Sequence, residues 1–145
     1  MSADALPTRG DYRRFERVET RWADNDVYGH VNNVVYYALF DTVINRVLVG
    51  AGLDPHGGDA IGLCVESGCR YVAPASYPEA LEAGLRVAKL GRSSVRYEVG
   101  VFRAGSEALC AFGHFVHVFV DRATRRPTPV PDGLRAALAA LATAP

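Results

Sequence analysis

A long apolar segment, residues 31–49, restricts the fold more than any other feature of this sequence. Thirteen of its nineteen residues are apolar, and beyond the first turn the polar ones share one narrow helical stripe: Asp41, Thr42, Asn45 and Arg46. The segment is too long for an ordinary strand and is apolar almost all round, which predicts a largely buried helix. Asn32 or Asn33 could cap its start, and Gly50 could end it. A helix enclosed to this degree requires a sheet around it.

The second half of the chain supplies the strands of that sheet. Residues 61–71 and 95–101 alternate between apolar and polar side chains, which is typical of half-exposed strands, and residues 85–90 form another. Residues 109–120 are apolar on both faces, which predicts a central strand covered on each side.

The remaining elements complete an α+β arrangement. Residues 12–21 predict an early strand, and residues 132–142 predict a short closing helix that Asp132 could cap. The order of strand, helix, several strands and helix is compatible with an antiparallel sheet. No internal repeat or long linker divides the chain, so we expect one domain over residues 1–145.

Composition argues against several classes of partner. Sixteen basic and sixteen acidic side chains cancel, which leaves no overall field to attract nucleic acid or an anionic membrane. No apolar run approaches the roughly 18 residues that a spanning helix needs, and residues 1–8 lack the basic start and apolar run of a secretion signal. We therefore expect a cytoplasmic protein. The three cysteines lack a Cys-x-x-Cys spacing, so buried free thiols are favoured over disulfides or a zinc site.

The turn that enters the apolar segment carries most of the chemically active side chains. Residues 21–33 read Arg-Trp-Ala-Asp-Asn-Asp-Val-Tyr-Gly-His-Val-Asn-Asn. A helix N-terminus exposes unpaired backbone N–H groups and a partial positive charge, which suit a carbonyl oxygen that gains negative charge. A carboxylate beside it would supply the matching base or nucleophile. Without further information, Asp and Asn before an apolar helix are most often caps.

This turn, followed by Tyr36 and Phe40-Asp41, resembles the signature of acyl-CoA thioesterases of the 4-hydroxybenzoyl-CoA thioesterase type, in the branch with a Gly-His-Val-Asn-Asn turn. Residues 89–98 and 117–121 also resemble strands of that family. The resemblance implies the hot-dog fold, an antiparallel sheet curled around one long helix, assembled as a homodimer or a dimer of dimers. It implies a hydrolase that cleaves an acyl-CoA thioester to a carboxylic acid and free coenzyme A, without a metal or redox cofactor.

The resemblance also implies roles for individual residues. Asp26 matches the catalytic carboxylate, which acts as a general base on water or attacks the thioester carbonyl itself. The backbone N–H of Asn33 would hydrogen-bond the thioester oxygen. Gly29 would let the turn adopt a conformation that other residues resist, close to the substrate. His30 is expected either to support the loop or to position water or the carboxylate, and Asp24 to accept hydrogen bonds within the turn.

A site for coenzyme A should show cations and small polar residues at the mouth of a narrow tunnel. One strand-to-strand corner meets this description, with an ordinary polar hairpin as the alternative: Lys89, Arg92, Ser93 and Ser94. On the helix, Val34, Tyr36 and Phe40 would border the acyl group, which favours fatty or aromatic acyl chains.

Three further titratable residues are predicted to be structural. Glu66 alternates with Arg70 on one face of its strand, which favours an ion pair over catalysis. His114 and His117 are three residues apart in a strand, so they point to opposite faces and cannot bind one metal ion together.

Two other functions stay open. Hot-dog proteins include enoyl-CoA hydratases, although here Asp26 and His30 are only four residues apart and the rest of the hydratase motif is absent. A non-catalytic acyl-CoA-binding protein is the second alternative, and it would be expected to carry an added regulatory segment.

Overall fold

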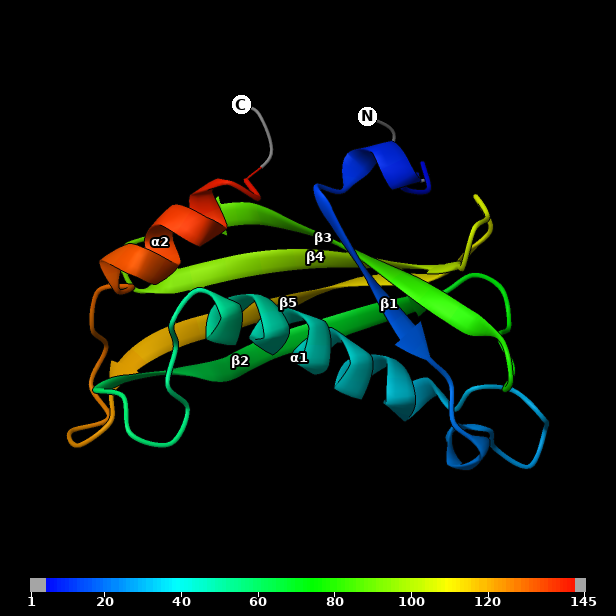
Figure 1. Ribbon diagram of the computed structural model, residues 1–145, viewed down its shortest axis with the longest axis horizontal. Helices are drawn as coiled ribbons and strands as arrows, with labels where there is room; N and C mark the ends of the chain where they lie inside the picture. Colours follow the sequence, from blue (N-terminus) through cyan, green and yellow to red (C-terminus); the bar gives the residue numbers. More distant parts are fainter. Residues whose placement is uncertain (1–4, 143–145) are drawn as a thin grey trace.

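Five antiparallel strands form one sheet that curls around a long helix in the computed structural model, which describes residues 5–142 (Figure 1). Across the sheet the strands follow the order β1-β3-β4-β5-β2. Their bounds are β1 (Arg14–Glu19), β2 (Ala60–Tyr71), β3 (Ala80–Leu90), β4 (Ser94–Arg103) and β5 (Leu109–Asp121), with helices α1 (Asn33–Gly50) and α2 (Asp132–Ala139). This is the predicted α+β hot-dog arrangement. The ends of the predicted domain, residues 1–4 and 143–145, lie outside the described residues.

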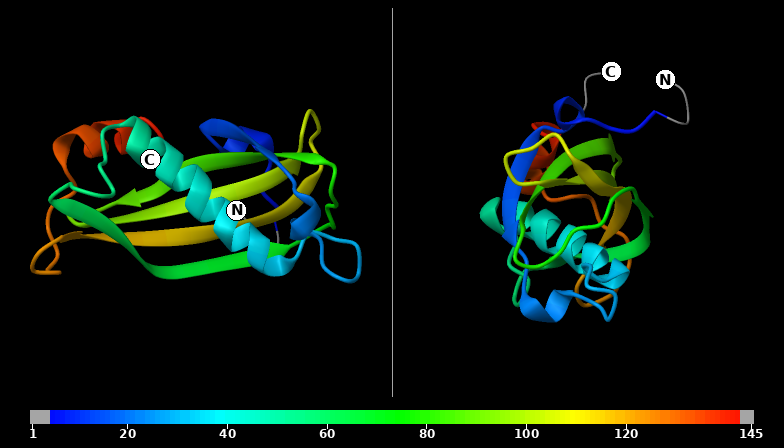
Figure 2. Two further views of the ribbon diagram at one scale, coloured as in Figure 1. Left: turned by 60° about the horizontal axis from the view of Figure 1, so that its bottom comes forward. Right: turned by 90° about the vertical axis from the view of Figure 1, so that its right-hand side faces the viewer.

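The predicted central helix is confirmed as α1, which crosses the concave face of the sheet (Figure 2). Asn32 is its cap, because its side chain accepts a hydrogen bond from the Val34 N–H at 3.2 Å, and Gly50 is its last residue. Its buried residues share one broad face, with spacings of three and four: Tyr36, Leu39, Phe40, Val43, Ile44, Val47 and Leu48. Val34 and Val49 on the other side are exposed, so the prediction of burial almost all round is wrong in part. Along α1 and α2 in the described chain, no helix is long and apolar enough to cross a membrane.

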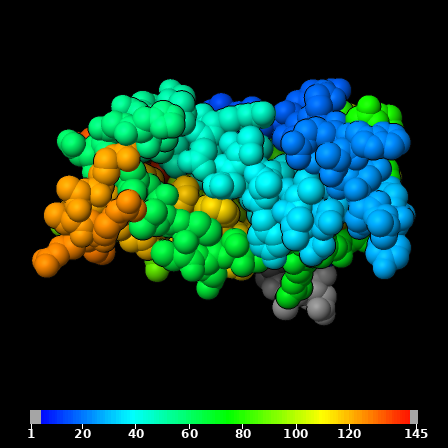
Figure 3. Space-filling model, turned by 90° about the horizontal axis from the view of Figure 1, so that it is seen from below, coloured from blue at the N-terminus to red at the C-terminus, as the bar shows by residue number. Residues whose placement is uncertain are grey.

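Strand β2 lies at the edge of the sheet and changes face halfway along. Cys64 pairs with His117 but Glu66 pairs with Val116, so Val65 forms a bulge. Because one extra residue reverses the side-chain direction, Leu63 shares a face with Val118, away from α1. The single alternating face predicted for residues 61–71 is therefore wrong. From below, the side chains leave a hollow between α1 and β2 (Figure 3).

Strand β5 lies between β4 and β2, as predicted for a central strand. Its inner side chains, such as Phe115 and Phe119, are buried under α1. Most of its outer side chains are only half-buried, among them Phe112 and His114, so the prediction of cover on each side is wrong for most of the strand. At the closing helix the prediction also fails in part, because the cap position of α2 holds Pro131 rather than Asp132.

Gly113→Ala is expected to destabilise the fold by about 2–3 kcal/mol. A Cβ at position 113 would overlap the carbonyl oxygen of Gly68 on β2 and lie 2.8 Å from Cε2 of Phe40 on α1. Moving either neighbour would cost free energy, since one is backbone and the other is a core side chain. Urea denaturation measures the effect. Gly50→Ala, where no atom lies within 4 Å of the added carbon, is the control and should unfold at the wild-type midpoint or above. An unchanged midpoint for Gly113→Ala would contradict this packing.

Candidate active site

The turn before α1 fixes the Asp26 carboxylate through its own backbone. The Asp26 N–H donates to the His30 carbonyl at 2.8 Å, and the Gly29 N–H donates to the Asp26 carbonyl at 3.1 Å. Gly29 has φ +82°, a left-handed conformation that favours glycine. Oδ1 of Asp26 accepts from the N–H groups of Tyr28 at 2.9 Å and His30 at 3.4 Å. Its Oδ2 has no hydrogen-bond partner in the described part of the chain, so it is available to another molecule.

Asp24 has the structural role that the sequence predicted. It is 5% exposed, and its carboxylate accepts the backbone N–H of Arg21 at 2.7 Å and the guanidinium of the same residue at 2.8 and 3.0 Å. Its carbonyl accepts the N–H of Asn32 at 2.8 Å. Asp24 therefore ties the turn to the start of α1.

The first turn of α1 leaves one backbone donor without an acceptor. The N–H groups of Val34 and Val35 donate to the side chain and the carbonyl of Asn32, at 3.2 and 2.9 Å. The N–H of Asn33 has no such acceptor among residues 5–142. Meanwhile the Tyr71 hydroxyl donates to the Asn33 carbonyl at 3.0 Å, which anchors the helix start to the end of β2. The arrangement leaves the Asn33 N–H for a ligand oxygen.

Asp26, Asn33 and Tyr36 meet at one cavity of about 340 Å³. The rest of its lining is mainly apolar: Val31, Tyr71, Val72, Ala73 and Pro74. The rings of Tyr36 and Tyr71 meet edge to face, with centroids 5.5 Å apart. Burial raises the pKa of Tyr36 to about 12, so this wall is uncharged near neutral pH. Asp26 and the first residue of α1 thus line the same apolar-walled cavity.

Sequence reasoning missed the segment after β2 that closes this site. Its Ala75 carbonyl accepts the N–H of Val31 at 2.7 Å, and the hydroxyl of Ser76 donates to the Gly29 carbonyl. It also missed Tyr71, the last residue of β2. These contacts join residues about forty or more positions apart, and no motif in the sequence marks them.

Three of the predicted residues lie elsewhere. The side chain of His30 is exposed and makes no hydrogen bond within the described chain, so only its backbone supports Asp26. Phe40 does not border the cavity, because it is fully buried in the core. Val34 is also outside the cavity lining and is 61% exposed.

The predicted coenzyme A corner lies at the other end of the sheet in the same protomer. Lys89 and Arg92 are exposed, and Ser93 and Ser94 are half-buried, where β3 turns into β4. Asp26 lies instead at the end where β2 finishes. With about 3.3 Å per strand residue, the length of β4 separates the two ends by about 30 Å. A single protomer therefore does not bring this corner to Asp26.

Glu66 and the two strand histidines contact other side chains of the sheet. Glu66 does not pair with Arg70, contrary to the prediction, but contacts Nε2 of His114 at 2.9 Å and Arg96 at 3.7 Å. His117 lies on the opposite face, where its Nδ1 contacts the Tyr97 hydroxyl at 3.0 Å. The prediction that the histidines face opposite sides is confirmed. No group of three or more metal-ligating side chains is present in the part of the chain that the structure describes.

Lowering the pH from 6.5 to about 4 is expected to destabilise the fold by about 3 kcal/mol through His117. Burial lowers the pKa of His117 from 6.5 to about 4, so the folded imidazole stays neutral in this window. The unfolded chain binds the extra proton there, and stability falls as the pH drops. Urea unfolding at several pH values measures the slope. His117→Gln should show a shallower slope, and equal slopes for the two proteins would contradict the assignment.

The chain is similar to known proteins of one family. The family model described as the thioesterase-like superfamily matches residues 20–138. The PA5185 protein from Pseudomonas aeruginosa strain PAO1 is 54% identical, and its crystal structure has a TM-score of 0.93 with 94% of this chain and 96% of that chain covered. The PA2801 protein from Pseudomonas aeruginosa, a candidate thioesterase, is 30% identical, with a TM-score of 0.81 and coverage of 86% and 96%.

A more distant structure shares the fold. It is Slr0204, a 1,4-dihydroxy-2-naphthoyl-CoA thioesterase from Synechocystis, at 19% identity and a TM-score of 0.79, with 86% of this chain and 94% of that chain covered. No curated protein matches the sequence. Because the family model covers most of the sequence and the similar structures extend over nearly all of it, the chain belongs to the thioesterase-like superfamily.

Proposed function

We propose that this protein is an acyl-CoA thioesterase that hydrolyses its substrate to a carboxylic acid and free coenzyme A. One observation carries the proposal: Asp26, which has a carboxylate oxygen without a partner in the described chain, and Asn33, whose N–H has no acceptor there, line the same apolar-walled cavity. Thioester hydrolysis needs both groups, since a base or nucleophile must act while the carbonyl oxygen gains charge. Family membership supports the same reaction class.

In the proposed reaction the thioester oxygen accepts a hydrogen bond from the Asn33 N–H. Asp26 takes a proton from water as the water oxygen bonds to the thioester carbon, or its carboxylate oxygen attacks that carbon and water then hydrolyses the resulting anhydride. In both routes the carbon–sulfur bond breaks and the departing thiolate takes up a proton as coenzyme A. No metal or other cofactor enters the proposed steps. The acyl group, fatty or aromatic, would rest against Tyr36 and Tyr71.

We place the coenzyme A phosphates on a second protomer. Strand β2 is an edge in one protomer, and the apolar Val65 on it is 59% exposed, which favours pairing with another strand. Antiparallel pairing of two β2 edges about a two-fold axis would turn the partner end for end. The corner at Lys89, Arg92, Ser93 and Ser94 of the partner subunit would then lie at the Asp26 end. The proposed assembly is a homodimer, alone or within a dimer of dimers.

Mixing two inactive variants is expected to restore activity if the site is shared between protomers. In a dimer of Asp26→Asn, both sites lack the carboxylate. In a dimer of the double variant Lys89→Gln/Arg92→Gln, both sites lack the two cations. After refolding together, half the dimers are mixed and each contains one intact site, so about a quarter of wild-type kcat/KM should return. Light scattering gives the assembly size. No recovery in a proven mixed dimer would show that Asp26 of one protomer does not share a site with Lys89 and Arg92 of its partner.

Release of free thiol from a panel of acyl-CoA thioesters tests the function itself. A thioesterase liberates thiol. A hydratase consumes enoyl-CoA without liberating thiol, and a binding protein does neither. The hydratase alternative has less support, because the His30 ring is exposed and outside the lining of the Asp26 cavity. Absence of thiol release across short, long and aromatic acyl-CoAs would refute the proposal.

A further inference from the structure

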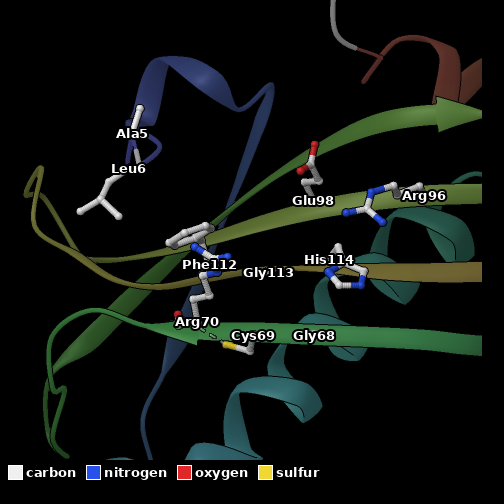
Figure 4. A pocket seen from close by; sticks show the side chains of 10 residues that line it. All are labelled: Ala5, Leu6, Gly68, Cys69, Arg70, Arg96, Glu98, Phe112, Gly113 and His114. Carbon is white, nitrogen blue, oxygen red and sulfur yellow. Dashed lines mark hydrogen bonds between the residues drawn. The ribbon is translucent and has the colours of Figure 1, made fainter. Parts of the chain in front are cut away.

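A second cavity lies on the outer face of the sheet, away from α1. Its volume is about 510 Å³, which is within the usual size range for small-molecule sites. Strands β2, β4 and β5 form its floor, and Ala5 and Leu6 of the N-terminal segment lie at one end (Figure 4). None of the residues assigned to the proposed reaction lines it. The cavity is therefore a separate candidate site.

Two arginines that line this cavity, Arg70 and Arg96, have guanidinium N–H donors without an acceptor in the described chain. Arg70 makes no hydrogen bond or ion pair with the residues that the structure describes, and its side chain is exposed. Arg96 lies 3.7 Å from Glu66, but that carboxylate is already closer to His114, at 2.9 Å. Each guanidinium has five N–H donors in a planar fork that matches phosphate oxygens. The pair provides donors on two sides of one cavity.

The carboxylates near the cavity do not cancel this charge. Glu98 lines the cavity but is engaged by Arg86 outside it, with Nη2 of the guanidinium 3.1 Å from Oε1. Counting the lining residues and their ion-pair partners, three arginines face two glutamates, with His114 between them. The balance is positive on a chain whose overall charge is zero. An anionic ligand is favoured over a cation.

The cavity also offers a flat apolar surface. Phe112 is half-buried, and its ring pairs with no other aromatic ring among the described residues. In Figure 4 its ring lies beside Arg70, with Leu6 on one side and His114 on the other. Gly68 keeps the floor open beside them, because a Cβ there would lie 2.6 Å from the His114 ring. An aromatic face next to guanidinium groups is a surface on which a nucleobase stacks.

We infer that this outer-face cavity binds a nucleoside phosphate, with the base against Phe112 and the phosphates on Arg70 and Arg96. The ligand is either a free nucleotide or the nucleotide end of coenzyme A, which would then bind here instead of at the partner subunit's Lys89 and Arg92. Arg70 and Tyr71 are consecutive at the end of β2, so this cavity and the Asp26 cavity lie on opposite sides of one strand end. Only the coenzyme A source rests on the proposed function. Nucleotide binding is measured without turnover, so its result does not depend on whether the protein is a thioesterase.

Calorimetric titration with ADP, adenosine 3′,5′-bisphosphate, inorganic phosphate and coenzyme A tests the inference. The nucleotides are expected to bind with dissociation constants below about 1 mM. Arg70→Gln and Arg96→Gln should each weaken nucleotide binding about tenfold. Phe112→Leu should weaken it about tenfold and leave inorganic phosphate unaffected. Arg126→Gln, which removes an exposed arginine in the turn after β5, is the matched control and should bind as wild type.

The variants also separate the two sources. Coenzyme A binding that falls with Arg70→Gln, but not with Arg92→Gln, identifies its nucleotide end as the ligand. If Arg70→Gln weakens the binding of ADP but leaves the binding of coenzyme A unchanged, the ligand of the cavity is a free nucleotide. No nucleotide binding at about 1 mM, or binding unchanged in all three cavity variants, overturns the inference. Phosphate binding with no gain from the adenosine overturns it as well.

Discussion

Asp26→Asn is expected to lower kcat/KM for thioester hydrolysis by about a hundred- to ten-thousandfold. The amide has almost the same shape, and its oxygen can still accept the N–H groups of Tyr28 and His30, so the turn should persist. It can neither take a proton from water nor attack the thioester. Steady-state release of thiol measures the loss, and circular dichroism checks the fold.

Asp59→Asn is the matched control for this substitution. Asp59 is an exposed carboxylate before β2 and is not part of the Asp26 cavity, so its variant should keep wild-type activity. A folded Asp26→Asn protein with full activity would show that another group performs the chemistry. A single turnover in ¹⁸O-water separates the two routes open to Asp26: label enters the enzyme only if its carboxylate attacks the thioester.

The parts of the fold that could be predicted from sequence depend on neighbours along the chain. The apolar period of residues 31–49 and the cap at Asn32 locate α1 to within two residues, because helix formation and capping are local. The hydrogen bonds that Asp26 itself makes are local too, since they join residues at most four positions apart. Here the motif and the geometry agree.

The predictions that failed depend on contacts between distant residues or on one extra residue. The bulge at Val65 reverses the faces of β2 without any Gly or Pro to mark it. Glu66 contacts His114 on the neighbouring strand, 48 positions away, and does not contact the nearby Arg70. The hydrogen bond from Tyr71 to Asn33 spans 38 positions. Such pairings follow from strand register, which periodicity alone does not determine.

Asn33→Pro is expected to lower kcat by about a hundredfold while α1 remains folded. Proline removes the N–H that would hold the thioester oxygen and changes little else at this position. Asn33 is the first residue of α1, where proline is tolerated because its N–H has no partner within the helix. The preceding Asn32 already has extended backbone with ψ 140°, as a residue before proline requires.

Asn33→Ala separates the backbone amide from the side chain. It keeps the N–H and removes only the carboxamide, so its kcat should stay near wild type, whereas a role for the side chain would lower kcat in both variants. Equal activity of folded Asn33→Pro and Asn33→Ala would exclude the amide as the donor to the thioester oxygen. The expected order, alanine active and proline slow, requires that the catalytic donor be the N–H at the start of α1, which has no acceptor in the described chain and belongs to a residue that lines the Asp26 cavity.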